Sequence, residues 1–359
     1  MSDSAKTRRT DAEPAPTRRW RGDRASAAWL IAPAMIVLAI VIGYPIVSAI
    51  IQSFSQDRIF NEQTGFFEEG GFAGLQNYWG WLMQDCGNGI NSCPRGTAGS
   101  QFWQSIGVTF FLTGVTVVIE VLLGFWIAII MGRNLWGRGL LRAAVLVPWA
   151  IPTAVTAKLW AFIFAPQGIV NSITGLDTQW TTGTWELLTA VIIADVWKTT
   201  PFVALLILAG LQMIPKDVYD AAKMDGATRW QQFTKVTLPL VKPALLVAIL
   251  FRLLDALRMY DLPAIMQGNT SGPATTMSML VTATIREGQF ANASALSTIV
   301  FLIIFACAFL MVKGLGVNAV DQAQPNRRKV GAGKSKKGTS ADTSSTKAVV
   351  MPREDAGGK

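Results

Sequence analysis

The chain has 359 residues, of which 51% are hydrophobic and only 15% are charged. This composition excludes an ordinary soluble domain and indicates a polytopic membrane protein. The formal net charge is +9, but the basic residues gather at the two ends and in short loops, a pattern typical of bilayer orientation rather than of nucleic-acid binding. The sequence contains no histidine, and we expect neither catalytic residues nor a metal site.

The chain begins with a polar, arginine-rich segment, residues 1–26, which we expect to be a disordered basic tail in the cytoplasm. Six apolar runs follow, each near the roughly 20 residues that a helix needs to cross a bilayer. They cover residues 27–54, 102–131, 140–164, 185–211, 243–260 and 293–312. The first run is too long for a cleaved secretory signal and should remain as an anchor. The sequence therefore predicts an all-α integral membrane protein with six transmembrane helices within residues 27–313.

Charge in the connecting loops predicts the orientation of these helices. The loops after the second and fourth runs are basic, whereas residues 55–101 carry more acidic than basic side chains. Because basic loops remain in the cytoplasm, both termini should lie inside and residues 55–101 should form an extracytoplasmic loop. That loop contains Cys86 and Cys93, which can either form a disulfide in a non-cytosolic compartment or remain as two free thiols.

The most informative stretch lies in the predicted cytoplasmic loop, residues 212–242. It reads Asp220-Ala-Ala, three residues, Gly226, nine residues, and then Val-Thr-Leu-Pro ending at Pro239. Pro215 suits the start of a short amphipathic helix, residues 216–224, and Gly226 suits the left-handed residue that ends it. Thr228 with Gln231 fits a capping box for a second helix. The pattern indicates a docking loop, although an ordinary link between two spans remains the alternative.

This pattern resembles the EAA loop (Glu-Ala-Ala, x3, Gly, x9, Ile-x-Leu-Pro) of permease subunits in binding-protein-dependent ABC importers, with Asp for Glu and Val for Ile. Residues 72–78, 147–152 and 208–215 resemble the maltose and trehalose branch of that family. No large outer domain is inserted between the third and fourth runs, as in trehalose importers. The resemblance implies the type I importer permease fold, with a coupling helix held by a cytoplasmic ATPase. The coupling residues that it implies are Tyr219, Asp220, Ala221, Ala222, Asp225, Gly226, Leu238 and Pro239.

The resemblance also implies partners and a location. The partners are a second permease subunit, two copies of an ATPase that bind ATP and Mg, an extracytoplasmic solute-binding lipoprotein, and membrane lipid. The cargo would be a sugar, such as the disaccharides trehalose or maltose, carried across the cytoplasmic membrane of a prokaryote. This chain itself would bind no cofactor. Alternatives are an importer for glycerol phosphate or an oligosaccharide, an ion-coupled secondary transporter, and a membrane scaffold.

Several ionisable residues fall inside the predicted spans, where each costs roughly 2.5–3.5 kcal/mol near the bilayer centre. They are Glu120, Asp195, Lys198, Arg252 and Asp255. Spacings of three residues suggest local ion pairs between Asp195 and Lys198, and between Arg252 and Asp255. These charges either hold helices together or line a polar pathway. For a sugar pathway, which needs hydrogen-bonding groups and aromatic platforms, the candidates are Trp197, Lys198, Asp255, Arg258, Tyr260 and Asp261.

The chain ends in a second polar segment, residues 314–359, which is rich in Gly, Ser, Thr and Lys. We expect a disordered basic cytoplasmic tail that is a candidate for contact with anionic lipid headgroups. Residues 331–335 end like a phosphate-binding loop but lack its leading glycine and any preceding strand, so we expect no nucleotide site there.

Overall fold

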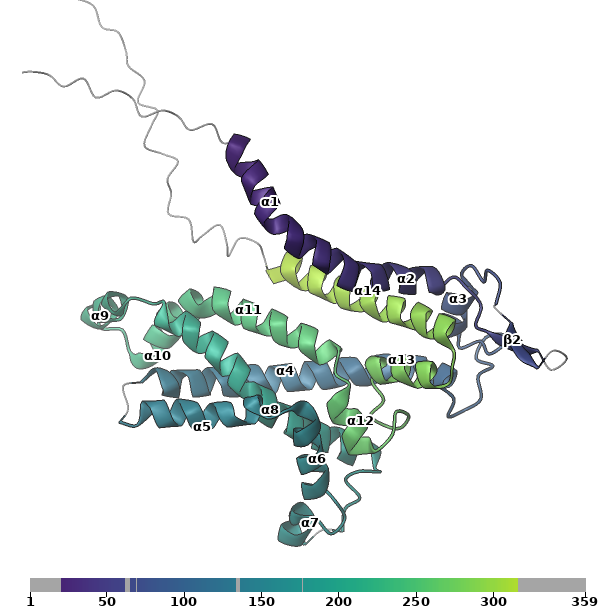
Figure 1. Ribbon diagram of the computed structural model, residues 1–359. Coiled ribbons are helices and arrows are strands. Elements are labelled where there is room, and N and C mark those ends of the chain that lie inside the picture. The colour runs from purple at the N-terminus through teal and green to yellow at the C-terminus, as the bar shows by residue number, and fades with distance from the viewer. Residues whose placement is uncertain (1–20, 62–64, 69, 134–135, 176, 316–359) are drawn as a thin grey trace, which may run out of the picture. The chain divides into compact units, whose positions relative to one another are not determined.

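The computed structural model describes residues 21–61, 65–68, 70–133, 136–175 and 177–315 (Figure 1). Most of the two expected tails lies outside these ranges. Helix α1 begins at Arg21, so the boundary expected after residue 26 is placed too far along the chain.

In chain order, the helices and strands are α1 (Arg21–Leu38), the π-helical turn η1 (Ala39–Gly43), α2 (Tyr44–Gln52), β1 (Ile59–Asn61), β2 (Phe66–Glu68), α3 (Gln76–Met83), the 3-10 helix η2 (Ala98–Gln101), α4 (Phe102–Gly132), α5 (Arg138–Ala150), α6 (Thr153–Ile163), α7 (Ile169–Thr174), α8 (Thr184–Gln212), α9 (Lys216–Met224), α10 (Arg229–Gln232), the π-helical turn η3 (Phe233–Thr237), α11 (Leu238–Leu257), α12 (Asp261–Gln267), α13 (Met277–Arg286) and α14 (Phe290–Leu315). The strands form one small antiparallel hairpin in which Phe60 pairs with Phe67. The described chain is therefore helical apart from this hairpin.

Among the described residues, four helices are long and apolar enough to cross a membrane by length and composition: Ala28–Gln52, Ala98–Gly132, Thr184–Gln212 and Phe290–Gly314. A bent pair of helices, α5 with α6, would make a fifth span. The fifth predicted span, residues 243–260, corresponds to α11, a 20-residue helix that carries Lys242, Arg252 and Asp255. Its charges, rather than its length, set it apart from the other spans.

The third predicted span is not one continuous helix. We expected a single helix over residues 140–164, but α5 and α6 meet at an angle of 89°. The break falls at Ile151 and Pro152, both of which have extended backbones. A residue before proline is disfavoured in helical conformation, and proline has no N–H to continue the hydrogen-bond ladder. The break therefore follows from Pro152, and it places the end of α5 beside the middle of α8.

Helices α4, α8 and α11 form the centre of the bundle, with α4 and α8 packed along much of their lengths (Figure 1). Small residues allow this close packing. A Cβ added at Gly124 of α4 would lie 3.0 Å from Val203 of α8, and one at Gly210 of α8 would lie 2.4 Å from Ala244 of α11. Small residues at helix contacts let backbones approach in a membrane, where burial of apolar surface gives little driving force.

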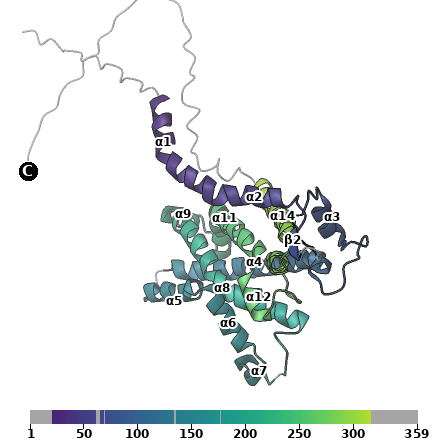
Figure 2. The same cartoon turned by 45° about the vertical axis from the view of Figure 1, so that its right-hand side comes forward.

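The expected outer end of the bundle joins segments that are far apart in the sequence. Helix α2 packs against α14, as the two views of the bundle show (Figures 1 and 2). The Asp57 carboxylate accepts hydrogen bonds from the backbone N–H groups of Ala291 (2.6 Å) and Asn292 (3.1 Å), near the start of α14. These N–H groups have no partner within the helix, so Asp57 caps it. The loop after α2 is thereby fixed to the last helix.

Candidate functional site

The predicted docking loop folds as an exposed helix, α9, between the ends of α8 and α11. Its bounds, Lys216–Met224, match those predicted from the sequence, and no residue within it is buried. Gly226 has a φ of +74°, the left-handed conformation expected there. Thr228 and Gln231 form the predicted capping box at the start of α10. The sequence motif therefore produces a short protruding helix with a fixed stop at its end.

Two hydrogen bonds anchor the loop. The Tyr219 hydroxyl lies 3.1 Å from the Thr237 hydroxyl, which joins α9 to the turn that precedes α11. The Gln232 side chain donates to the Ala227 carbonyl at 2.8 Å, across the junction between α9 and α10. The first contact ties α9 to the turn before α11, and the second braces the segment between α9 and α10.

The eight predicted coupling residues lie on this loop and at the start of α11. Asp220 forms an exposed ion pair with Lys223 at 2.8 Å. Ala221 and Asp225 are exposed, whereas Ala222 is half-buried. Leu238 and Pro239 open α11, where a proline costs no helical hydrogen bond.

A cluster of buried charges lies where α4, α8 and α11 meet. Arg252 of α11 is 1% exposed, and it contacts Glu120 of α4 (0% exposed) and Asp195 of α8 (5%). Its Nε and one terminal nitrogen donate to the two Glu120 carboxylate oxygens, and that same terminal nitrogen donates to Asp195. The other terminal nitrogen donates to Asp255 at 3.0 Å. One guanidinium therefore links three helices through three carboxylates.

The partners of these charges differ in part from our expectation. Arg252 and Asp255 form the local pair that their spacing allows, but Asp195 and Lys198, for which the spacing also allowed a pair, do not contact each other. Asp195 instead contacts Arg252 on another helix. Lys198 donates to the Ile151 carbonyl at 3.2 Å, because the break between α5 and α6 leaves that carbonyl without a helical partner. Spacing on one helix could not reveal either contact.

A polar hollow of about 470 Å³ opens beside the cluster. Five of the six predicted pathway residues line it together: Lys198, Asp255, Arg258, Tyr260 and Asp261. The Asp255 side chain is 64% exposed although its carboxylate contacts the buried Arg252, so it belongs to both the cluster and the hollow. The sixth residue, Trp197, does not line the hollow and instead packs edge-on against Trp160, with ring centroids 5.8 Å apart.

Two further residues line this site: Trp149, which the sequence offered as one of several aromatic platforms for a sugar ring, and Thr199, which sequence reasoning missed. Trp149 lines both this hollow and a neighbouring one of about 610 Å³, and its ring stacks on Phe202 at a centroid distance of 5.8 Å. Thr199 lines both hollows, and its hydroxyl shares its proton between a Glu120 carboxylate oxygen at 2.5 Å and the Asp195 carbonyl of its own helix at 2.6 Å. The only signal for Thr199 was its position one residue after Lys198, and hydroxyls at such positions usually bond their own helix.

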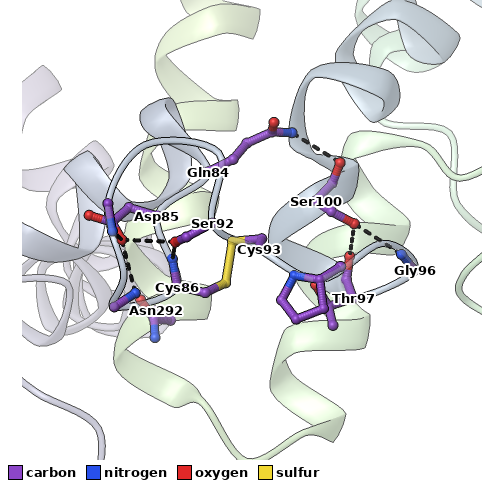
Figure 3. The surroundings of a disulfide bond; sticks show 12 residues. Gln84, Asp85, Cys86, Ser92, Cys93, Gly96, Thr97, Ser100 and Asn292 are labelled. Carbon is purple, nitrogen blue, oxygen red and sulfur yellow. Dashed lines mark hydrogen bonds between the residues drawn. A yellow bond between two sulfur atoms is a disulfide. The ribbon is translucent and has the colours of Figure 1, made fainter.

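The loop predicted to lie outside the membrane contains a disulfide between Cys86 and Cys93 (Figure 3). Between these residues the chain turns around the Asp85 carboxylate. That carboxylate accepts hydrogen bonds from the N–H groups of Gly87 and Gly89, both at 2.9 Å, and from the Ser92 hydroxyl at 3.2 Å. The backbone N–H groups of Gly87 and Gly89 are the main reason that the pKa of Asp85 is lowered. The loop is therefore held by one disulfide and by the hydrogen bonds that the Asp85 carboxylate accepts.

Comparison with known proteins establishes the family. Residues 120–318 match the family described as the binding-protein-dependent transport system inner membrane component. The chain belongs to this family and is a permease component of the inner membrane, as the resemblance in the sequence predicted. Its fold agrees, since a crystal structure of a bacterial ABC transporter involved in the import of the acidic polysaccharide alginate matches with a TM-score of 0.60 at 20% identity, over 82% of this chain and 98% of that one.

Several curated relatives are similar over most of their length. The trehalose/maltose transport system permease protein MalF of Thermococcus litoralis is 36% identical, over 79% of this chain and 91% of the relative. The trehalose transport system permease protein SugA of Mycobacterium tuberculosis is 34% identical, over 83% and 91%. The sulfoquinovosyl glycerol transport system permease protein SmoG of Agrobacterium fabrum is 32% identical, over 72% and 80%.

Proposed function

We propose that the chain carries a disaccharide such as trehalose or maltose inward, as one of two permease subunits of an ATP-driven importer. The observation that carries this proposal is the similarity to MalF and SugA, at 36% and 34% identity over about four-fifths of the chain. The hollow lined by Asp255, Arg258 and Tyr260 supports it. Sugar hydroxyls need charged or amide partners for hydrogen bonding, and the apolar face of a pyranose ring packs on an aromatic side chain.

The proposed partners are a second permease subunit, two ATPase subunits that hold ATP and Mg, and an extracytoplasmic solute-binding lipoprotein. The exposure of α9 supports docking to the ATPase, because its apolar residues Val218 and Met224 are 37% and 84% exposed. Exposed apolar side chains on a short polar helix favour a protein contact.

In the proposed mechanism, α9 moves with the ATPase as a rigid lever. Closure of the ATPase pair on ATP would displace α9, and the bond between Tyr219 and Thr237 would pass the movement to α11. Helix α11 carries Arg252 and Asp255, so its displacement would reshape the hollow. The nucleotide can shift the bundle only through contacts that differ between the two states, and α9 would make those contacts.

Uptake of labelled sugar tests the cargo. Cells that lack their own disaccharide uptake, and that express this chain with its partner subunits, should accumulate labelled trehalose or maltose.

Arg258→Gln should reduce uptake by roughly tenfold, the usual effect of losing one good polar contact. The matched control is Lys242→Gln, a cation on the same helix that does not line the hollow. Stronger competition by glycerol phosphate or an oligosaccharide than by either disaccharide would contradict the proposed cargo, and uptake driven by an ion gradient without ATP would indicate a secondary transporter.

Crosslinking tests the docking of α9 separately from the cargo. A crosslinker attached through Met224→Cys should capture a nucleotide-binding subunit, which mass spectrometry can identify. The control is Thr182→Cys, an exposed position between α7 and α8 at the expected outer end. If Met224→Cys captured no ATPase in cells that take up the sugar, the docking role of α9 would be wrong.

A further inference from the structure

A hollow of about 840 Å³ lies behind α9, between that helix and the ends of α4 and α8. Four basic residues line it, and none of its lining residues is acidic: Arg133, Lys216, Lys223 and Arg229. They come from separate places, namely the end of α4, two positions on α9 and the start of α10. The fold therefore gathers positive charge that is scattered along the sequence.

Little of this charge is neutralised by the chain itself. Lys223 forms an ion pair with Asp220, and both side chains are more than 60% exposed. Within the part of the chain that the structure describes, no ion pair involves Arg133, Lys216 or Arg229. Residues 216, 219 and 223 share one face of α9, which places its two lysines and Tyr219 toward the hollow. Such a concentration of cations attracts an anion and favours a phosphate group.

The other wall of the hollow is apolar. Ile129 of α4 and Leu208 and Leu211 of α8 line this part of the hollow. These residues belong to helices that are long and apolar enough to cross the membrane, and they lie near the basic ends of those helices. A hollow that combines four cations with apolar side chains from two spans fits an amphiphile with an anionic head better than it fits a small soluble anion.

We propose that this hollow binds the phosphate headgroup of an anionic phospholipid from the adjacent leaflet, with the start of an acyl chain against α4 and α8. Basic pockets between membrane helices on the cytoplasmic side are suited to such headgroups. The bound headgroup joins α9 and α10 to the end of α4 through Lys216, Arg229 and Arg133. The site does not depend on the identity of the sugar or on ATPase docking.

Native mass spectrometry of the purified transport complex tests the site. The complex is stripped of lipid and titrated with phosphatidylglycerol, phosphatidylcholine or water-soluble glycerol phosphate. Phosphatidylglycerol should bind more tightly than phosphatidylcholine and glycerol phosphate. The triple variant Arg133→Gln, Lys216→Gln, Arg229→Gln should lose at least about tenfold in phosphatidylglycerol affinity, since each basic residue near the surface contributes to attraction. Higher salt should weaken binding, because exposed charges are screened.

The matched control removes three cations that do not line the hollow, in the variant Lys235→Gln, Lys242→Gln, Lys313→Gln. It should bind phosphatidylglycerol as the unmodified complex does. Equal loss in both triple variants, or equal binding of phosphatidylglycerol and phosphatidylcholine, would overturn the site. Glycerol phosphate binding as tightly as the lipid would overturn the choice of a lipid and assign the hollow to a soluble anion. If the first triple variant does not assemble, Lys216→Gln with Arg229→Gln replaces it, and unchanged affinity in that variant would overturn the proposal.

Discussion

Arg252 contacts three carboxylates, two of them buried inside the bundle, and breaking these contacts is more costly than their net stabilising contribution. A buried ion pair contributes little net stability relative to well-packed apolar residues, because desolvation offsets its attraction. Removing one partner lowers stability strongly, because the remaining charge is then buried without a compensating charge. Glu120 and Arg252 are almost fully buried, so loss of either one leaves the other as an uncompensated charge between α4 and α11.

We expect Arg252→Met to destabilise the protein by about 3–5 kcal/mol, because Glu120 and Asp195 lose their shared cation. Thermal unfolding of the purified complex in nanodiscs measures the change. Adding Glu120→Gln and Asp195→Asn to Arg252→Met should recover much of the loss, since the unpaired charges are then removed. If the single variant melted like the unmodified protein, or if the triple variant were no better than the single, this account of the cluster would be wrong.

Asp85 gives the disulfide-containing loop a pH-dependent contact. Hydrogen bonds from Gly87 and Gly89 lower its pKa in the folded loop. Its stabilising contribution is therefore complete above the pKa of an unfolded aspartate, about 4, and is lost as the pH falls through the lower folded value. We expect a phosphine to reduce the disulfide between Cys86 and Cys93 faster below about pH 4. Asp85→Asn should remove this pH step, and a step of the same size in that variant would contradict the assignment.

At the scale of elements, α9 is defined by the residues on either side of it. Pro215 precedes it in an extended conformation, Gly226 ends it, and a capping box begins the next helix. A Cβ at Gly226 would meet nothing within 4 Å, so the constraint there is the backbone conformation and not the available space. The direction in which α9 protrudes thus depends on one left-handed residue.

Gly226→Val should impair coupling, because a β-branched residue in the left-handed region costs roughly 1–2 kcal/mol and the turn after α9 will change to relieve it. Gly226→Asn is the matched control, since asparagine tolerates this conformation. We expect the valine variant to insert normally but to hydrolyse ATP without sugar uptake, and the asparagine variant to keep both activities. Both are measured in proteoliposomes that contain the whole importer. Normal uptake by the valine variant would show that the turn does not set the coupling.

The contact between α8 and α11 depends on Gly210. A Cβ there would lie 2.4 Å from Ala244, which is closer than atoms can approach. Gly210→Leu should therefore separate the helices and destabilise the complex by about 1–3 kcal/mol, as overpacking usually does. Gly114→Leu on α4 is the control, because a Cβ there meets nothing within 4 Å. Thermal unfolding of both variants is the measurement, and equal losses would mean that close packing at Gly210 does not matter.

At the scale of the whole molecule, the orientation of the bundle in the bilayer remains a prediction. The basic loops place the α9 end in the cytoplasm and the disulfide loop outside. Lys235→Cys should therefore react with a membrane-impermeant thiol reagent only in opened cells, and Thr182→Cys should react in intact cells. Each is made in a chain with Cys307→Ser, so that the only other cysteines are the disulfide pair. Labelling of Lys235→Cys in intact cells would reverse the predicted orientation.

The sequence predicted the long helices and α9 because their signals are local. Apolar runs located α4 and α8 to within a residue or two, and Pro215 with Gly226 delimited α9. Local signals of this kind could not predict contacts between segments that are distant in the sequence. The pairing of Asp195 with Arg252, and the capping of α14 by Asp57, depend on how helices meet in space. The break before α6 was also missed, because we extended the apolar run through Pro152 rather than ending the helix there.

The position of Arg252 in the chain has a consequence for biogenesis. Glu120 and Asp195 precede it by 132 and 57 residues, so both carboxylates leave the ribosome first. At usual elongation rates, roughly 7–26 s pass between the synthesis of Glu120 and that of Arg252. Until then the nascent protein carries unneutralised acids in its early segments, and α11 carries a cation that a lipid environment disfavours. We therefore expect the translocon to retain α4 and α8 until α11 emerges, and to release the three as a unit.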